Sequence, residues 1–138
     1  MVRRAYGVML PAWVVALPLA TYAATRVQAS TLTHAFAFAV YSIGSLICHQ
    51  KPDRSFHLWA TQLPVCARCT GIYIGGALGL VMRWRKPASW ALAVAAVPTA
   101  VTLVYEWTTG DTPSNAIRFA AGLPLGAVAS WLVTRSIE

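Results

Sequence analysis

The three cysteines of the chain lie close together in the sequence, and they are its most reactive side chains. They are Cys48, Cys66 and Cys69. Cys66 and Cys69 form a C-x-x-C pair two residues after Pro64, a place that suits the first turn of a helix. Free amides and the positive end of the helix dipole favour thiolates there, and Arg68 between the cysteines adds positive charge. Thiolate is the form that binds a metal or attacks a disulfide.

These cysteines could bind a metal, form a disulfide or take part in thiol–disulfide exchange, and the sequence does not decide between these functions. With His49, the three thiols match the ligands of a tetrahedral zinc site, and copper and iron are the alternatives. Neighbouring Cys48 and His49 rarely reach one ion together, so either could complete the site. An odd number of cysteines argues against a purely structural disulfide framework, although one disulfide could pin the loop. Thiol–disulfide exchange is a further hypothesis. His34 and His57 are weaker ligand candidates.

Polar residues elsewhere are expected near the cysteines, either around a metal or as a pocket for an anion. An arginine in a membrane helix is costly and usually pairs, so Arg118 should meet Glu106, Asp53 or an anionic ligand. Arg54, Arg68 and Arg118 could bind an anion or a lipid headgroup. A bundle without any small ligand is the remaining alternative. The predicted surrounding residues are Gln50, Arg54, Arg68, Tyr73, Glu106, Ser114, Asn115 and Arg118.

Composition indicates that lipid surrounds the elements that carry these residues. Of the 138 residues, 57% are hydrophobic and 11% are charged, whereas soluble domains carry about 25% charged residues. The net charge of +7 is scattered between apolar runs without forming a basic stripe. That pattern favours contact with anionic lipid headgroups over nucleic-acid binding. We therefore expect one integral membrane domain over residues 1–138, with the bilayer as its partner and no nucleic acid.

Five apolar runs predict the helices that position the site. They cover residues 5–24, 34–48, 69–82, 88–107 and 116–133. A membrane span needs about 20 residues, so the short second run is expected to be a tilted helix or a re-entrant segment. The first run resembles a signal peptide, but no convincing cleavage motif follows it, and an uncleaved helix is expected. The predicted fold is an all-α polytopic transmembrane bundle with four or five membrane helices.

Glycines repeat every four residues on two of these runs. The third run carries Gly71, Gly75 and Gly79, and the last run carries Gly122 and Gly126. Small residues at this spacing let helix backbones approach closely in lipid. We expect ordinary packing within the bundle, and a helix-mediated homo-oligomer is the alternative.

Positive charge predicts the orientation of the chain in a cell membrane. The densest short basic loop, at residues 83–86, is expected in the cytoplasm, together with Arg135. The segment 48–69 then lies on the extracytoplasmic side. With four spans Arg3 and Arg4 are cytoplasmic as well, whereas five spans place them outside, which the charge rule disfavours.

The residues around the cysteines resemble the signature of a family of small prokaryotic membrane proteins of unknown function. The signature reads CHQ at 48–50, RSF at 54–56 and PVCARCTGIY at 64–73, and it continues at Ser114, Asn115, Arg118 and Gly122. The resemblance covers roughly residues 48–126. It implies residence in a membrane and a shared site, and it brings no established activity.

Overall fold

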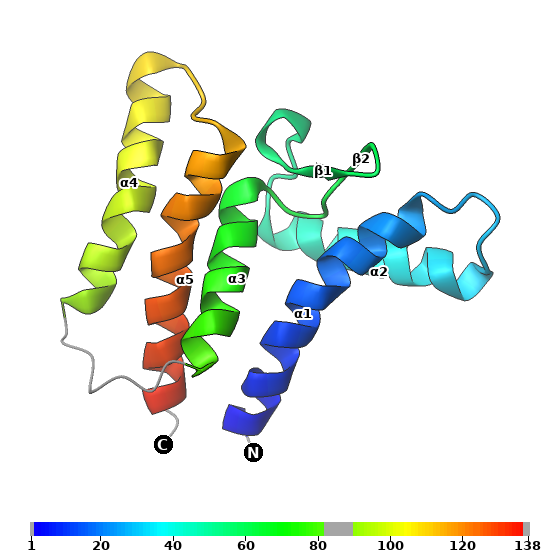
Figure 1. Cartoon of the computed structure of the whole chain (residues 1–138), viewed down its shortest axis with the longest axis horizontal. Coiled ribbons are helices and arrows are strands. Elements are labelled where there is room, and N and C mark those ends of the chain that lie inside the picture. The colour runs from blue at the N-terminus through cyan, green and yellow to red at the C-terminus, as the bar shows by residue number, and fades with distance from the viewer. Residues whose placement is uncertain (1, 82–89, 137–138) are drawn as a thin grey trace.

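The computed structural model describes residues 2–81 and 90–136, and within them it confirms the predicted all-α class (Figure 1). The basic loop at 83–86 lies outside the described residues. A short 3-10 turn, Pro52–Arg54, and a two-stranded hairpin, β1 (His57–Leu58) and β2 (Thr61–Gln62), join the second helix to the third. The helices are α1 (Val2–Ala24), α2 (Thr31–Ile47), α3 (Ala67–Val81), α4 (Ala91–Thr109) and α5 (Asn115–Ser136).

Three of the helices, α1, α4 and α5, are long and apolar enough to cross a membrane. Their hydrophobic surface faces outwards: no more than 33% of any of these spans is buried within the protein. Such a surface suits lipid and not water. α2 and α3 are apolar but shorter, with 17 and 15 described residues. The expectation of four or five membrane helices is thus confirmed for three of them.

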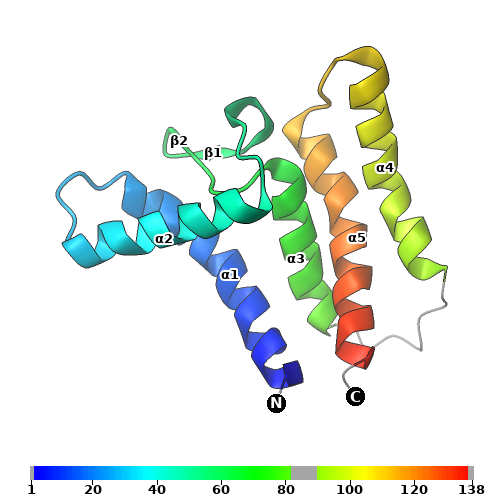
Figure 2. The ribbon, with the colours of Figure 1, turned by 180° about the vertical axis from the view of Figure 1, so that it is seen from behind.

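The helices form an upright group with one helix lying beside it. α3, α4 and α5 stand side by side, and α1 leans against α3 (Figures 1 and 2). α2 crosses α1 and lies beside the group, with its last turn near the start of α3, and both chain termini lie at the end of the group opposite to the starts of α3 and α5. The short second apolar run is therefore a helix lying strongly tilted relative to its neighbours. The hairpin lies at the end where α3 and α5 begin.

Glycines hold α3 and α5 together in a parallel pair. A Cβ atom at Gly122 or Gly126 would collide with the backbone of α3. Conversely, glycines of α3 lie directly on backbone carbonyl groups of α5, in the pairs Gly71–Phe119, Gly75–Leu123 and Gly79–Ala127. Each of these pairs is separated by 48 positions, so the two helices run in the same direction in one register. The predicted close approach is confirmed, and both glycine ridges are used within the chain.

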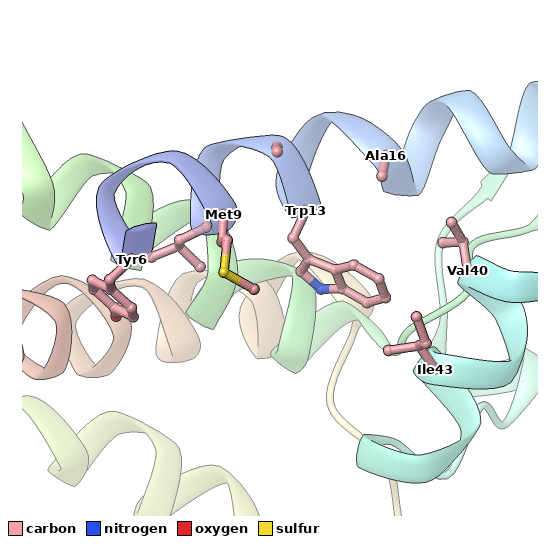
Figure 3. Close-up of a pocket in the computed structure, with 8 residues that line it drawn as sticks. Tyr6, Met9, Trp13, Ala16, Val40 and Ile43 are labelled. Carbon is pink, nitrogen blue, oxygen red and sulfur yellow. The ribbon is translucent and has the colours of Figure 1, made fainter. Parts of the chain in front are cut away.

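A small apolar core joins α1, α2 and the segment before α3. It consists of Leu17, Ala20, Val40 and Val65, and we call it the α1–α2 core. Beside it, an open groove of about 620 Å³ runs between α1 and α2. Figure 3 shows Trp13 of α1 facing Val40 of α2 across this groove. Its lining is almost entirely apolar, so the groove contributes no acid, base or ligand to the site.

Candidate functional site

The three cysteines meet where α2 ends and α3 begins. Cys48 caps the C-terminus of α2, and its amide donates to the carbonyl oxygen of Gly44 at 2.9 Å. Cys66 directly precedes α3, and Cys69 lies in the first turn of that helix. The three Sγ atoms all lie within 4.8 Å of one another. Cys48, which is distant in the sequence, therefore lies beside the C-x-x-C pair, as a shared site for the three thiols requires.

Backbone amides at the start of α3 point at two of the sulfurs. The amide of Cys66 donates to Sγ of Cys48 at 3.1 Å, and the amide of Cys69 donates to Sγ of Cys66 at 3.5 Å. Amides in the first turn of a helix have no partner within the helix, so sulfur accepts here as an N-cap side chain does. Cys66 is buried, whereas Cys48 and Cys69 are half-buried and pack against the α1–α2 core.

The thiols influence one another's ionisation. Hydrogen bonds from the thiols of Cys66 and Cys69 lower the pKa of Cys48 well below its usual range. The hydrogen bond to Cys48 raises the pKa of the Cys66 thiol. A negative charge on Cys48 opposes the ionisation of the other two thiols. A cation held between the sulfurs would offset this repulsion and allow several thiolates to coexist.

Of the four ligands predicted for a metal, the structure brings together the three cysteines without His49. His49 is exposed, and its Nδ1 accepts from the amide of Lys51 at 3.1 Å. Cys48 has an extended backbone, with φ −146° and ψ 143°, and neighbouring side chains on extended backbone point to opposite sides. His34 and His57 are also exposed, and the ligand cluster found in the described part of the chain includes neither of them.

Two of the predicted surrounding residues lie beside the cysteines. Tyr73 follows Cys69 by one turn of α3, packs against the α1–α2 core and meets the ring of Trp13 edge-on, with centroids 6.2 Å apart. Gln50 donates through Nε2 to the carbonyl oxygens of Tyr41, at 2.9 Å, and Pro64, at 2.6 Å. Gln50 thereby fastens the end of α2 to the segment that leads into α3. It holds the two halves of the cysteine cluster together.

A second polar cluster surrounds Glu106, in the last turn of α4. Arg118 of α5 donates through Nε to Oε1 at 3.0 Å and through Nη2 to Oε2 at 3.2 Å. Arg68 donates through Nη2 to Oε1 at 2.7 Å, and Arg54 through Nη1 to Oε2 at 3.2 Å. Three arginines therefore share one carboxylate, and we call these four residues the arginine cluster. Of the partners expected for Arg118, the structure selects Glu106.

Arg68 belongs to the arginine cluster although it lies between two cysteines in the sequence. Successive residues of a helix are turned by about 100°, so Arg68 leaves α3 in a different direction from Cys69. Its Nη2 also donates to Oγ1 of Thr102, at 3.1 Å. Its charged partner is Glu106, which it shares with Arg54 and Arg118. Asp53 lies 3.6 Å from Nε of Arg54 and is largely exposed at the edge of the cluster.

Ser114 and Asn115 fix the start of α5. The Ser114 hydroxyl accepts from the amide of Ile117 at 3.4 Å, as an N-cap side chain does. Asn115 donates through Nδ2 to the carbonyl oxygen of Ser55 at 3.1 Å. These contacts tie the loop after α2 to α5 and so position Arg54 next to Arg118.

The sequence did not single out several residues that support the two clusters. Thr102 precedes Glu106 by one helical turn, so the i, i+4 spacing could have revealed it. Tyr41 donates through its hydroxyl to the carbonyl oxygen of Gln62, and Gln62 donates to that of Gln50. No local sequence pattern predicts these contacts, because they join segments that come together only when the loop is folded.

Comparison with known proteins identifies the family of the chain. The family described as "Predicted membrane protein (DUF2085)" matches residues 48–132, which include both clusters. An uncharacterised protein of Methanocaldococcus jannaschii is 33% identical over 116 residues, which cover 78% of this chain and 74% of the relative. An uncharacterised protein of Methanothermobacter thermautotrophicus is 33% identical over 86 residues, which cover 58% and 78% respectively. No solved structure matches. The chain therefore belongs to the DUF2085 family of membrane proteins.

Proposed function

We propose that this membrane protein binds a thiophilic transition metal ion through Cys48, Cys66 and Cys69. The observation that carries the proposal is the separation of the Sγ atoms, at most 4.8 Å from one another. Tetrahedral zinc with Zn–S bonds of about 2.3 Å requires sulfurs about 3.8 Å apart. The thiols would have to move by about 1 Å or less to reach that spacing. A disulfide, by contrast, would require two of the sulfur atoms to approach each other to about 2.05 Å.

The chemistry of the donors narrows the class of metal. Sulfur ligands select zinc, copper or iron over magnesium and calcium, which prefer oxygen. Three thiolates leave one position of a tetrahedral zinc ion for a ligand from outside the cluster. His49 is turned away, and so the fourth ligand would be water, a small molecule or a partner. A site of this kind is open to exchange and differs from a closed structural zinc site.

The place of the cysteines in the fold supports an extracytoplasmic position for the site. Both termini lie at the end of the helices opposite to the cysteines, and Arg4 and Arg135 belong to that far end. Basic residues favour the cytoplasmic face of a membrane. We therefore place the cluster at the extracytoplasmic surface of a multi-pass cell-membrane protein.

Thiol–disulfide exchange is the second candidate, and the low pKa of Cys48 favours it. A thiolate at Cys48 lies within reach of the C-x-x-C pair. In this reaction Cys66 and Cys69 would form a disulfide and give up two electrons and two protons. A disulfide of a partner would take them up and become two thiols. The two candidates differ in metal content and in the number of free thiols.

Elemental analysis with thiol counting tests the proposal. The protein is purified in detergent under reducing conditions, exposed to zinc, copper(I) or iron(II), and freed of unbound metal. We expect about one metal ion per chain, and three reactive thiols after chelation under denaturing conditions. Substitution of Cys66→Ser should abolish stoichiometric binding. His49→Ala is the matched control and should retain the metal, because His49 lies outside the cluster.

Two outcomes would contradict metal binding. Wild-type protein that stays free of all three metals while keeping three thiols would refute the proposal. Protein with one reactive thiol and a disulfide between Cys66 and Cys69, obtained without added oxidant, would favour thiol–disulfide exchange. Equal loss of metal in the His49→Ala and Cys66→Ser variants would show that binding does not occur at the sulfur cluster.

A further inference from the structure

We propose that the arginine cluster binds a phosphoryl-type oxyanion, supplied either by a phospholipid headgroup or as free phosphate. This site is distinct from the cysteine cluster, and the proposal does not depend on metal binding. Its basis is the arrangement of Arg54, Arg68 and Arg118 around Glu106, at the end of the bundle where α3 and α5 begin and α4 ends.

The cluster contains more positive than negative charge. Three guanidinium groups face one carboxylate, which leaves an excess of two positive charges, and exposed Asp53 at the edge reduces it to one. Arg118 and Glu106 are nearly inaccessible to solvent, with side-chain exposures of 1% and 5%. Uncompensated charge in such a place is costly. A phosphoryl group carries between one and two negative charges near neutral pH, and it would restore the balance.

Glu106 is already saturated as an acceptor. Its two oxygens accept four N–H groups, two at each oxygen, and a carboxylate offers about four acceptor positions. Each arginine nevertheless keeps one buried nitrogen without a hydrogen-bond partner among the described residues. The nitrogens are Nε of Arg54, whose ion pair with Asp53 is long at 3.6 Å, Nε of Arg68 and Nη1 of Arg118. Further acceptor atoms are therefore needed, and Glu106 cannot provide them.

The surroundings favour an oxyanion as the source of these acceptors. Arginine forks match the geometry of phosphate and carboxylate oxygens better than that of a spherical anion such as chloride. Arg68 and Arg118 lie in the first turns of α3 and α5, where the helix dipoles also favour negative charge. The Arg54 side chain is 25% exposed, so the anion has access from the loop after α2. Phospholipid headgroups present such phosphoryl groups at a membrane surface.

Binding of inorganic phosphate tests the free-anion source. The protein is delipidated in a maltoside detergent, which contains no phosphate, and titrated with phosphate at constant ionic strength against chloride. Calorimetry and thermal unfolding are followed together. We expect phosphate to bind and to raise Tm, and Arg54→Gln to weaken binding by about tenfold or more, since it removes one charged donor. Arg26→Gln is the matched control: it removes the same charge from a residue that stacks on Tyr22, with its guanidinium 4.5 Å from the ring centroid.

Native mass spectrometry tests the lipid source. Protein is reconstituted in nanodiscs of phosphatidylcholine with or without phosphatidylglycerol, and the retained phospholipid is measured after release. Phospholipid retained by wild type and by Arg26→Gln, but lost in Arg54→Gln, would assign the ligand to a headgroup. Binding of inorganic phosphate with the same pattern would assign it to the free anion. The absence of binding in both experiments, or equal weakening by both substitutions, would overturn the proposal. The metal content of Arg54→Gln should remain that of wild type.

Discussion

At the scale of single residues, the protein concentrates its unusual chemistry in two groups that share the first turn of α3. Cys66 and Cys69 leave that turn towards Cys48, and Arg68 leaves it towards Glu106. The sulfur atoms are of the kind that binds metal cations, and the arginine group carries an excess of positive charge. The two groups share one helical turn, because a rotation of about 100° per residue divides neighbouring side chains between different directions.

Glu106→Gln is expected to destabilise the fold strongly. The substitution leaves three arginines around a neutral amide, and breaking one side of a buried ion pair costs about 3 to 5 kcal/mol. The measurement is the thermal unfolding of detergent-solubilised protein, followed by circular dichroism. Asp53→Asn is the control: it removes the same charge from an exposed side chain and should change stability by about 0.5 kcal/mol or less. Equal stability of both variants would refute the structural role of Glu106.

Residue patterns predicted those contacts that avoid the free-energy cost of an unpaired charge or polar group in lipid. A charge in an apolar helix must find a partner, so Arg118 could be assigned to a small set that included Glu106. Cysteines far apart in the sequence could be grouped because a membrane protein offers few polar places. His49 could not be assigned, because the extended backbone at Cys48 decides its direction. The contacts of Tyr41 and Gln62 depend on the path of a loop that no periodic pattern describes.

At the scale of the elements, α3 and α5 form the frame to which both clusters are attached. Their backbones lie in direct contact, with glycines of each helix against carbonyl groups of the other. α4 contributes Glu106 and Thr102 to this frame. α2 contributes Cys48 from the side, through a loop held by Gln50. Hydropathy revealed these helices, and the shortness of the second apolar run left a tilted helix and a re-entrant segment as alternatives; the structure shows the tilted helix α2, of 17 residues (Figure 1).

Gly75→Ala should destabilise the α3–α5 pair. The added methyl group would collide with the carbonyl oxygen of Leu123, and overpacking of this kind costs about 1 to 3 kcal/mol. Gly7→Ala in α1 is the control, because nothing lies within 4 Å of the added carbon and alanine is the better helix former by about 0.5 to 1 kcal/mol. Unfolding of both variants by denaturant in detergent measures the difference. Equal stability of the two variants would contradict the packing described.

At the scale of the whole molecule, the arrangement of the helices separates two ends of different character. One end carries both polar clusters, the hairpin and the starts of α3 and α5, and the other carries both termini (Figure 2). Apolar surface covers the region between them. This division suits a protein whose two ends lie on different sides of a membrane. Of the described helices, α1, α4 and α5 are long and apolar enough to connect the two sides.

We expect the cysteine end outside the cytoplasm and the termini inside. Alkaline phosphatase inserted at Gly110, between α4 and α5, should be active, whereas a C-terminal fusion should be inactive and a fluorescent protein there should fold. The reason is the rule that places Arg4 and Arg135 on the cytoplasmic face. The reverse pattern of reporter activities would invert the topology. It would then place the cysteine cluster and the arginine cluster on the cytoplasmic face.

The shared register of α3 and α5 also limits where residues can be inserted into or deleted from the chain. Because the three glycine pairs keep one separation of 48 positions, a residue inserted between Gly71 and Gly75 would rotate every later glycine by about 100°. Bulky side chains would then face the carbonyl groups of α5. Point substitutions on the lipid-facing side are free of this constraint. Homologues should therefore differ freely in the lipid-facing residues of α3 and in the lengths of their loops. An insertion or deletion inside α3 should be rare.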